Sequence, residues 1–212
     1  MEEYWKLRLP KIKDNGVFIL TATQPFASDL INSNRKMFRY DLIWQKTMAC
    51  GHLNSKKMPM RNHEIILVFY RKLPTYNPIM VKANRVRVER RRMFSYCYGK
   101  VDTNRIFNYS SDVRYPVSLI SIKHDKERSN TKTRNNAHPT QKPVSLFEYL
   151  IKTFTNQGDV VFDGFSGGGT TAIACVNLNR NYICCEINED YYNLSQNRLK
   201  KAIEEKKQML FD

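Results

Sequence analysis

The sequence predicts an α/β protein with a Rossmann-like, doubly wound sheet whose strands are mostly parallel and which carries an antiparallel edge hairpin. The first observation is a strand, a glycine loop, a helix and a second strand between Asp159 and Glu186, which is the order of a parallel β-α-β unit. The second is a pair of β-prone runs at residues 38–45 and 63–70, which we expect to pair as antiparallel strands. The third is size, because 212 residues with 42% hydrophobic content suit one α/β domain with an insertion, or one domain and a small subdomain.

The first seventy residues are predicted to alternate between helices and strands. We expect a helix, a buried strand, a second helix and two further strands at residues 2–12, 17–22, 27–34, 38–45 and 63–70. Residues 13–16 stop the first helix, and residues 24–26 turn the chain into the second. Residues 46–62 are predicted to be a long connection, a type of segment that usually carries function rather than core.

Charge and cysteine content restrict the class of protein. A net charge of +15 indicates a polyanionic partner, most simply nucleic acid. No run is apolar and long enough for a membrane span or a secretion signal, so we expect a cytoplasmic protein with no membrane partner. The cysteines form no C-x-x-C pair, which favours reduced core thiols over disulfides or a zinc site, and no metal is expected. They are Cys50, Cys97, Cys175, Cys184 and Cys185.

A basic insertion is predicted at residues 71–136. Residues 82–134 contain fourteen Lys and Arg side chains against five acidic ones. Interleaved aromatic residues favour short strands and loops over a disordered tail. Cations of this kind contact phosphates without reading sequence, so the segment predicts DNA or RNA binding, with a solvated basic face as the alternative. The residues assigned to DNA contact are Arg85, Arg87, Arg90, Arg91 and Arg92.

The glycine loop follows an apolar run, Val160 to Phe162, that fits a buried strand. Four glycines within seven residues then interrupt the strand and expose backbone. Either Thr170 or Thr171 is predicted to cap a helix at residues 172–178. A second buried strand, residues 182–185, ends at Glu186.

This unit predicts a nucleoside-binding site. Backbone without side chains lets a ligand approach closely, and a carboxylate about 20 residues further on accepts both ribose hydroxyls. The loop imitates a P-loop, but Thr170 stands where the phosphate-binding Lys is needed. The dinucleotide pattern G-x-G-x-x-G does not fit these glycines either. S-adenosylmethionine, a nucleoside without a pyrophosphate, fits best, and a purely structural turn is the alternative.

Residues 138–143, His-Pro-Thr-Gln-Lys-Pro, precede an amphipathic helix predicted at residues 144–155. His138 alone could be a zinc ligand or a base, but no partner pattern lies nearby. The better interpretation is a loop against the cofactor pocket, because it leads through the helix into the glycine strand.

These motifs together resemble the amino-methylating DNA methyltransferases of restriction-modification type, the adenine-N6 and cytosine-N4 family, in the permuted order with the catalytic half first. Residues 138–143 are similar to the family's H-P-T-x-K-P segment, and residues 163–171 to its D-x-F-x-G-S-G-T-T loop, with Gly168 in place of Ser. Glu186 and Asp190-Tyr191 match the acid and the D/E-Y that follow the next strand. The first half also has family counterparts at Asn15-Gly16, Gln24-Pro25-Phe26, Trp44-Gln45-Lys46 and His63-Glu64.

The resemblance implies a methyltransferase sheet that binds S-adenosylmethionine and double-stranded DNA. It divides the chain into an incomplete catalytic half at residues 1–70, a target-recognition insertion at 71–136 and a cofactor-binding half at 137–212. Asp163 and the loop should face the methionine end, and Glu186 the ribose. The implied cofactor-binding residues are His138, Thr140, Lys142, Asp163, Gly164, Phe165, Ser166, Gly167, Gly169, Thr170, Thr171 and Glu186.

One departure from the family concerns catalysis. Family members carry a D/N/S-P-P-Y/F/W tetrapeptide that binds the target amine, whereas none of the eight prolines here are adjacent. We therefore assign no catalytic residue. By the resemblance, the tetrapeptide and at least one strand would lie N-terminal to Met1, so we expect a sheet that is incomplete at its centre and exposes apolar surface.

Two functional hypotheses follow from this departure. The first is a fragment of a DNA methyltransferase, with adenine N6 favoured over cytosine N4, whose catalytic segment lies upstream or in a separate N-terminal polypeptide. A homo-oligomer is a further option for the partner. The second is a catalytically inactive remnant that only binds DNA or S-adenosylmethionine, and an RNA or protein methyltransferase ranks below both.

Overall fold

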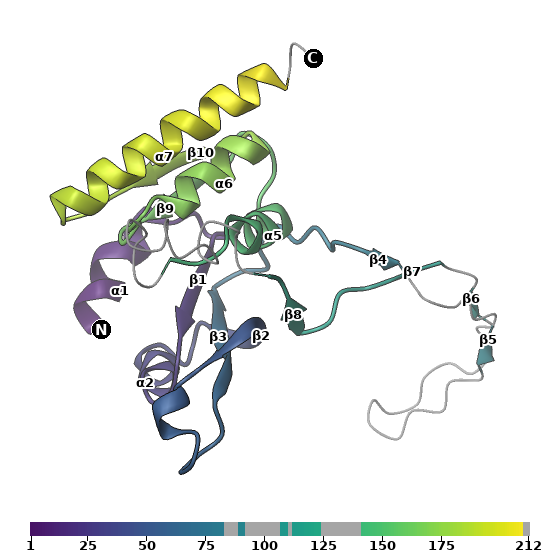
Figure 1. Ribbon diagram of the computed structural model, residues 1–212. Helices are drawn as coiled ribbons and strands as arrows, with labels where there is room; N and C mark the ends of the chain where they lie inside the picture. Colours follow the sequence, from purple (N-terminus) through teal and green to yellow (C-terminus); the bar gives the residue numbers. More distant parts are fainter. Residues whose placement is uncertain (83–88, 92–106, 110–111, 124–140, 210–212) are drawn as a thin grey trace. The chain divides into compact units, whose positions relative to one another are not determined.

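The computed structural model describes residues 1–82, 89–91, 107–109, 112–123 and 141–209 (Figure 1). The chain divides into two compact units, one formed by Met1–Asn77 with Ser118–Asp212 and the other by Pro78–Val117. The larger unit contains helices and sheets in alternation, which confirms the predicted α/β class.

The larger unit has a four-stranded sheet in the order β1 (Val17–Ala22), β3 (Arg61–Tyr70), β2 (Phe38–Cys50) and β8 (Leu119–Ser121). β3 is antiparallel to both β1 and β2, and β8 is parallel to β2. Three of these strands therefore run in one direction and β3 alone opposes them. The predicted antiparallel pairing is confirmed, with Gln45 opposite His63.

The connection predicted at residues 46–62 is shorter than expected. β2 continues to Cys50 and β3 begins at Arg61, so the turn comprises only residues 51–60, with the short 3-10 helix η2 (His52–Asn54). A register shift between Gln45 and Cys50 marks an irregular ladder. Pairing extends here through exposed residues, because backbone hydrogen bonds need no apolar side chains.

Helices cover both faces of the four-stranded sheet. On one face, α1 (Glu2–Arg8), the 3-10 helix η1 (Leu9–Lys11) and α2 (Phe26–Ser33) pack against Leu67 and Phe69. On the other, α5 (Val144–Phe154) packs against Ile66 and Val68. These four consecutive β3 residues are completely buried, as expected when alternate side chains enter two filled layers. The predicted helices at the N-terminus and before the glycine strand are confirmed.

A second, two-stranded sheet consists of β9 (Val160–Asp163) and β10 (Asn181–Cys184), paired in parallel. Between them comes α6 (Thr170–Leu178), and α7 (Glu189–Gln208) follows. Both helices lie side by side over one face of the pair (Figure 1). There, Val161 and Tyr182 pack on Ala174 and Cys175.

The opposite face of the β9–β10 pair is not covered. Val160, Phe162 and Ile183 are 59%, 45% and 56% exposed. The prediction of two buried strands is therefore wrong for this face, because the alternating side chains find a helix layer on one side only. Within the residues that the structure describes, no strand pairs with the second edge of β9 or of β1.

Among its described residues, the smaller unit contains two short antiparallel ladders. β4 (Val81–Lys82) pairs with β7 (Val113–Arg114), and β5 (Glu89–Arg91) pairs with β6 (Phe107–Tyr109). This unit lies within the predicted 71–136 insertion, whereas β8 belongs to the main sheet. The division into three functional parts stays a prediction.

The cysteines are only partly as expected. Cys175 is buried and Cys184 half-buried, but Cys50 and Cys185 are exposed, so the prediction of core thiols is wrong for these two. Cys185 follows the last residue of β10, where successive side chains point in opposite directions. Cys97 lies outside the described residues. No described helix has both the length and the apolar character needed to cross a membrane.

Candidate functional site

The candidate site lies at the carboxyl ends of β9 and β10, which meet at one edge because the strands are parallel. Asp163 pairs in register with Cys184. Beyond the strands, Cys185 N–H donates to Asp163 O at 2.8 Å, and Ser166 N–H donates to Cys185 O at 3.0 Å. The glycine loop is thus hydrogen-bonded to the chain after β10, which brings Asp163 and Glu186 to the same edge.

Asp163 organises the two ends of the loop. Its Oδ1 accepts from Phe165 N–H at 2.9 Å, and its Oδ2 accepts from the Thr171 hydroxyl. One carboxylate therefore connects the start of the loop to the first turn of α6.

Glu186 also binds the loop. Its Oε2 accepts from Gly167 N–H at 2.7 Å and its Oε1 from Asn188 N–H at 3.0 Å. A carboxylate offers about four acceptor positions, so these two bonds use part of its capacity. The carboxylate predicted to face a ribose is thereby held at the glycine loop.

The start of α6 differs from the prediction. Gly169 is the N-cap, with φ +77°, and neither Thr170 nor Thr171 caps the helix. Both threonines are buried in the first turn, and a Cβ on Gly169 would lie 2.8 Å from Ser195 Cβ in α7. The left-handed backbone and the close approach of α7 therefore both require glycine at position 169. Its contact with the cofactor stays a prediction.

The remaining glycine-loop residues have separate contacts. Gly164 lies against α1, where an added Cβ would be 3.3 Å from Arg8 Nη2. Gly167 has φ +50°, a conformation that favours glycine. Gly168 O accepts a hydrogen bond from Arg198 of α7.

Lys142 connects the site to the first sheet. Thr170 Oγ1 donates to Lys142 O at 3.4 Å. The Lys142 ammonium lies 3.5 Å from Glu64 Oε2, and Lys46 Nζ lies 2.5 Å from Glu64 Oε1. The three side chains are only 19%, 13% and 17% exposed for Lys142, Lys46 and Glu64. We call these three residues the ion triad.

Electrostatics at the ion triad favour the charged carboxylate. Burial is the largest single influence on the pKa of Glu64 and raises it, but the Lys46 hydrogen bond and the nearby Lys142 charge hold that pKa below its ordinary value. In the sequence, Lys46 and Glu64 are distinguished only as part of the family resemblance. Lys46 and Glu64 occupy alternating positions of two strands that were predicted to pair, and this was the available signal for their contact. That signal does not identify Lys142 as their partner.

Two exposed apolar side chains flank the carboxylates. Phe165, a predicted site residue, is 78% exposed, and Ile187 is fully exposed. Ile187 was missed, although its place directly after Glu186 in the sequence was a usable signal. Exposed apolar surface beside convergent polar groups is typical of ligand sites.

The thiols of Cys175 and Cys184, which are influenced by the Asp163 charge, are unreactive. Burial raises the pKa of both Cys175 and Cys184 to about 12, and the Asp163 charge adds to the shift at each. They are therefore neutral thiols near pH 7 and weak nucleophiles. Among the residues that the structure describes, no cluster of three or more His, Cys, Asp or Glu side chains could hold a metal ion.

Several predicted contacts cannot be placed. His138 and Thr140 lie outside the described residues, as do Arg85, Arg87 and Arg92. Arg90 and Arg91 belong to β5, but the positions of their side chains are not described. These assignments to cofactor and DNA binding stay predictions.

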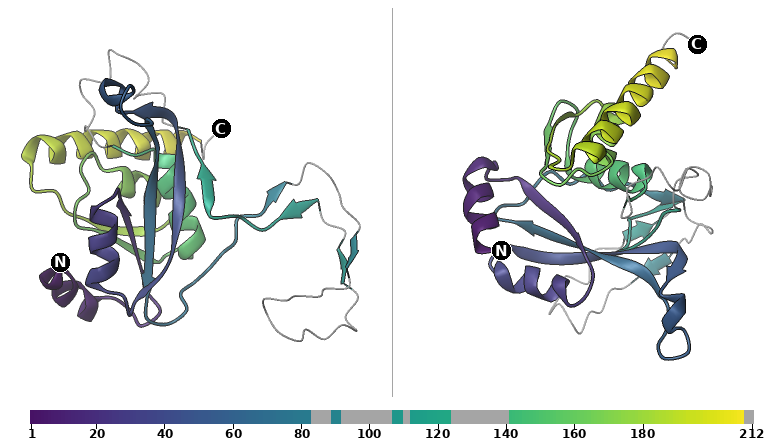
Figure 2. Two further views of the ribbon diagram at one scale, coloured as in Figure 1. Left: turned by 90° about the horizontal axis from the view of Figure 1, so that it is seen from below. Right: turned by 60° about the vertical axis from the view of Figure 1, so that its left-hand side comes forward.

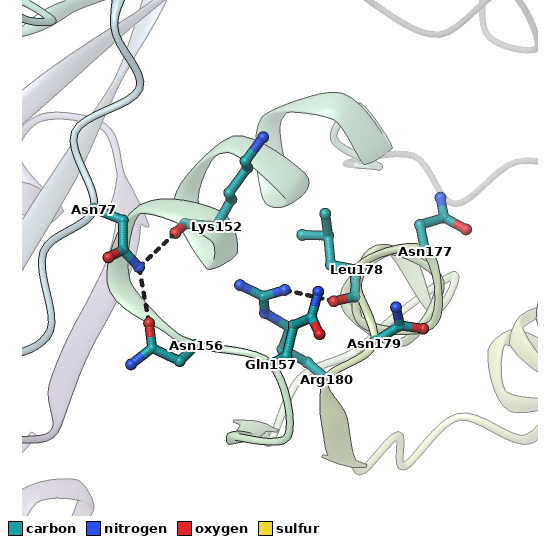
Figure 3. Close-up of a pocket in the computed structure, with 8 residues that line it drawn as sticks. All are labelled: Asn77, Lys152, Asn156, Gln157, Asn177, Leu178, Asn179 and Arg180. Carbon is teal, nitrogen blue, oxygen red and sulfur yellow. Dashed lines mark hydrogen bonds between the residues drawn. The ribbon is translucent and has the colours of Figure 1, made fainter.

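Two hollows lie apart from the paired carboxylates. The larger, about 450 Å³, is lined by amide and basic side chains at the amino ends of β9 and β10 (Figure 3). There, Asn77 donates to Lys152 O, and Arg180 donates to Leu178 O, so both cap helix ends. A second hollow of about 310 Å³ lies between β10, α6 and α7, and Ser166 and Gly169 of the glycine loop are among its lining residues. Neither is lined by Asp163 or Glu186.

Comparison with known proteins adds a family match. The model of a family described as DNA methylase matches residues 1–197. The Type II methyltransferase M1.MboII of Moraxella bovis is 30% identical over 185 residues, covering 85% of this chain and 70% of that protein. The Type II methyltransferase M.HpaI of Haemophilus parainfluenzae is 45% identical over 62 residues, 29% of this chain and 20% of that protein.

Two solved structures have a similar fold. M1.HpyAVI in complex with SAM has a TM-score of 0.65 at 24% identity, covering 93% of this chain and 81% of that chain. The cytosine-N4-specific PvuII DNA methyltransferase has a TM-score of 0.60 at 17% identity, covering 95% of this chain and 75% of that chain.

Proposed function

Because the chain belongs to the DNA methylase family, we propose that it is a site-specific DNA methyltransferase component that uses S-adenosylmethionine (SAM) to methylate an exocyclic base amine. The observation that carries the proposal is the pair of carboxylates at the adjoining ends of β9 and β10. Asp163 and Glu186 are both hydrogen-bonded to the glycine loop between them. That arrangement suits a nucleoside ligand lying across the ends of parallel strands.

The residues at this edge fit SAM in chemistry. Glu186 would accept from ribose hydroxyls, and exposed Ile187 and Phe165 offer apolar surface for a flat base. Asp163 would face the methionine end. Bound SAM supplies an electrophilic methyl group on a sulfonium. The chain's own contribution is to hold the loop, through the Asp163–Thr171 and Glu186–Gly167 bonds, in one conformation.

We propose adenine N6 as the first candidate target and cytosine N4 as the second. Either amine must leave the base stack to meet the methyl donor. Duplex DNA fits the net charge of +15, and such a substrate would place the protein in the cytoplasm.

Catalysis would need a further extended segment. The chain has no adjacent prolines and so no D/N/S-P-P-Y/F/W tetrapeptide. We propose that such a segment pairs with the second edges of β9 and β1. Lys13 Nζ, just before β1, lies 4.0 Å from Asp159 Oδ1, just before β9, which supports strands that start from the same side. Exposed Val160 and Phe162 would then be covered.

A second candidate function is binding of SAM or DNA without turnover. The missing tetrapeptide favours it. In this case the uncovered edges would belong to a remnant, and no added segment would restore activity.

Methyl transfer from radiolabelled SAM to duplex DNA tests the proposal. The chain is assayed alone and with a polypeptide that carries a strand ending in Asp-Pro-Pro-Tyr, followed by analysis of the methylated base. Methyl transfer in either assay, if it is abolished by Glu186→Gln, supports the proposed methyltransferase. SAM binding without methyl transfer in either assay supports the remnant that binds without turnover. Absence of SAM binding overturns the proposed cofactor.

A further inference from the structure

The tip of the β2–β3 hairpin exposes an unusual group of apolar side chains. We define this hairpin tip as residues 48–61. Met48, Leu53, Met58 and Met60 are 66%, 87%, 59% and 45% exposed. Single exposed apolar residues are common, but four within one short turn suggest an interaction surface, and Met is frequent in surfaces that adapt to a partner.

The hairpin tip is an ordered element. Gly51, at φ +94°, turns the chain, and η2 follows it. Backbone N–H groups of Asn54, Lys57 and Met58 donate within the tip at 2.8 to 3.0 Å. In Figure 2 (right) the tip projects beyond the helices that cover the sheet. The apolar side chains are therefore presented by a folded turn, which limits the entropy lost on binding.

The charge of the hairpin tip favours a polyanionic partner. No acidic residue occurs between Asp41 and Glu64. Lys56, Lys57 and Arg61 are exposed, and none of them has an ion pair within the described part of the chain. A cationic surface without acids complements a polyanion, whereas a typical protein partner would be met by both signs of charge.

We propose that the hairpin tip is a second DNA-binding element, separate in sequence from the basic insertion. Lys56, Lys57 and Arg61 contact phosphates, while Leu53 and Met58 pack against bases in a groove. Apolar side chains flanked by cations act in this way in proteins that unstack or bend DNA. The inference rests on the proposed function, because it takes DNA as the partner.

Salt-dependent DNA binding tests the cationic part. The affinity of Lys56→Gln/Lys57→Gln for a duplex is measured by fluorescence anisotropy across a range of salt. The control is Lys200→Gln/Lys201→Gln, which removes the same charge from exposed positions on α7. We expect the slope of log affinity against log salt to fall by about 1.8 for the hairpin variant, from two lost phosphate contacts, and to stay unchanged for the control. An equal change in both variants overturns the proposal.

Apolar contact with the bases tests the second part of the proposal. For Leu53→Ser/Met58→Ser we expect a roughly tenfold loss of affinity with an unchanged salt slope, because apolar contact with the bases is lost and no charge is removed. We also expect loss of the 2-aminopurine fluorescence increase that unstacking produces. Unchanged DNA affinity together with an altered oligomeric state in sedimentation would assign the tip to protein contact instead, and overturn the proposal.

The outcomes separate this inference from the proposed function. If the wild-type chain binds DNA and both hairpin variants bind equally well, only the inference fails. If the wild-type chain does not bind DNA, the proposed substrate fails with it. SAM binding, measured separately, then still tests the cofactor half.

Discussion

The two sheets of the larger unit have similar apolar strands but different surroundings. Four consecutive residues of β3, from Ile66 to Phe69, are completely buried between two helix layers. In the β9–β10 pair, Val160, Phe162 and Ile183 are about half exposed, although their sequence is equally β-prone. Burial of a strand is therefore decided by what covers it, and the covering layers cannot be read from the strand itself.

The two regions are nevertheless connected. α5 contributes Leu146, Leu150 and Phe154 to the core of the four-stranded sheet and Ile151 to that of the β9–β10 pair. The ion triad adds a polar link, because Lys142 contacts Glu64 on β3 and accepts from Thr170 at the start of α6. We expect substitutions in the core of the four-stranded sheet to lower stability most. We expect substitutions in the ion triad to affect the candidate site as well.

The largest expected difference compares one aromatic residue from each region. Phe69→Ala should lower the free energy of unfolding by about 3 to 5 kcal/mol, because a fully buried ring leaves a cavity. Phe162→Ala should cost about 1 kcal/mol, since Phe162 is 45% exposed and its ring lies under the Arg8 guanidinium, 4.5 Å from the ring centre. Urea denaturation measures both values. Equal losses would show that the uncovered face is in fact sealed in solution.

Gly169→Ala is expected to have the next largest effect. The left-handed backbone and the 2.8 Å approach to Ser195 Cβ should together cost about 2 to 4 kcal/mol. Gly158→Ala is the matched control, with φ +82° and open space around its Cβ, and should cost only about 1 to 2 kcal/mol. If the two variants unfold at the same urea concentration, close packing of α6 on α7 does not explain Gly169.

Glu64→Gln tests the link between the regions. Removing the carboxylate leaves Lys46 and Lys142 without their anion and should cost about 1 to 3 kcal/mol, below the range for fully buried pairs because Glu64 is 17% exposed. Glu205→Gln, which removes an exposed pair with Lys201, should cost about 0.5 kcal/mol or less. Urea denaturation curves of both variants provide the comparison. If Glu64→Gln loses no more unfolding free energy than Glu205→Gln, the ion triad does not stabilise the fold.

A smaller effect is expected in how the stability difference between wild type and Glu64→Gln depends on pH. Because the folded pKa of Glu64 lies below its ordinary value of 4.5, the carboxylate stabilises the fold above about pH 4.5. This contribution is lost as the pH falls through the folded pKa. The stability difference between wild type and Glu64→Gln should therefore shrink on acidification. A difference that grows instead would mean that the folded pKa is raised.

Local pattern was sufficient for most elements of the fold. The strand predicted at residues 17–22 is β1, and the helix predicted at 144–155 ends one residue earlier. These elements have a clear pattern of apolar residues and clear boundary residues, so their positions are determined by the local sequence. The end of β2 was missed because residues 47–50 are exposed and the segment 46–50 carries no apolar alternation.

The candidate site was predictable in identity but not in contacts. The positions of Asp163 and Glu186 follow from parallel strands, as expected. Glu186 also accepts from Gly167, and Lys142 contacts Glu64, 78 positions away in sequence. Such partners depend on tertiary packing between distant elements, which no local pattern encodes. The Thr170 or Thr171 cap was wrong because a left-handed glycine starts the helix instead.

Calorimetric titration of SAM tests the assignment of the cofactor site, with wild type, Glu186→Gln and the control Glu204→Gln, which changes an exposed acid near the end of α7. Glutamine keeps an acceptor for Gly167 N–H but loses the charge. The account predicts saturable binding by wild type and by the control, weakened roughly tenfold or more in Glu186→Gln by loss of charged hydrogen bonds to ribose. No binding by wild type, or equal binding by all three proteins, would contradict the assignment of this edge as the SAM site.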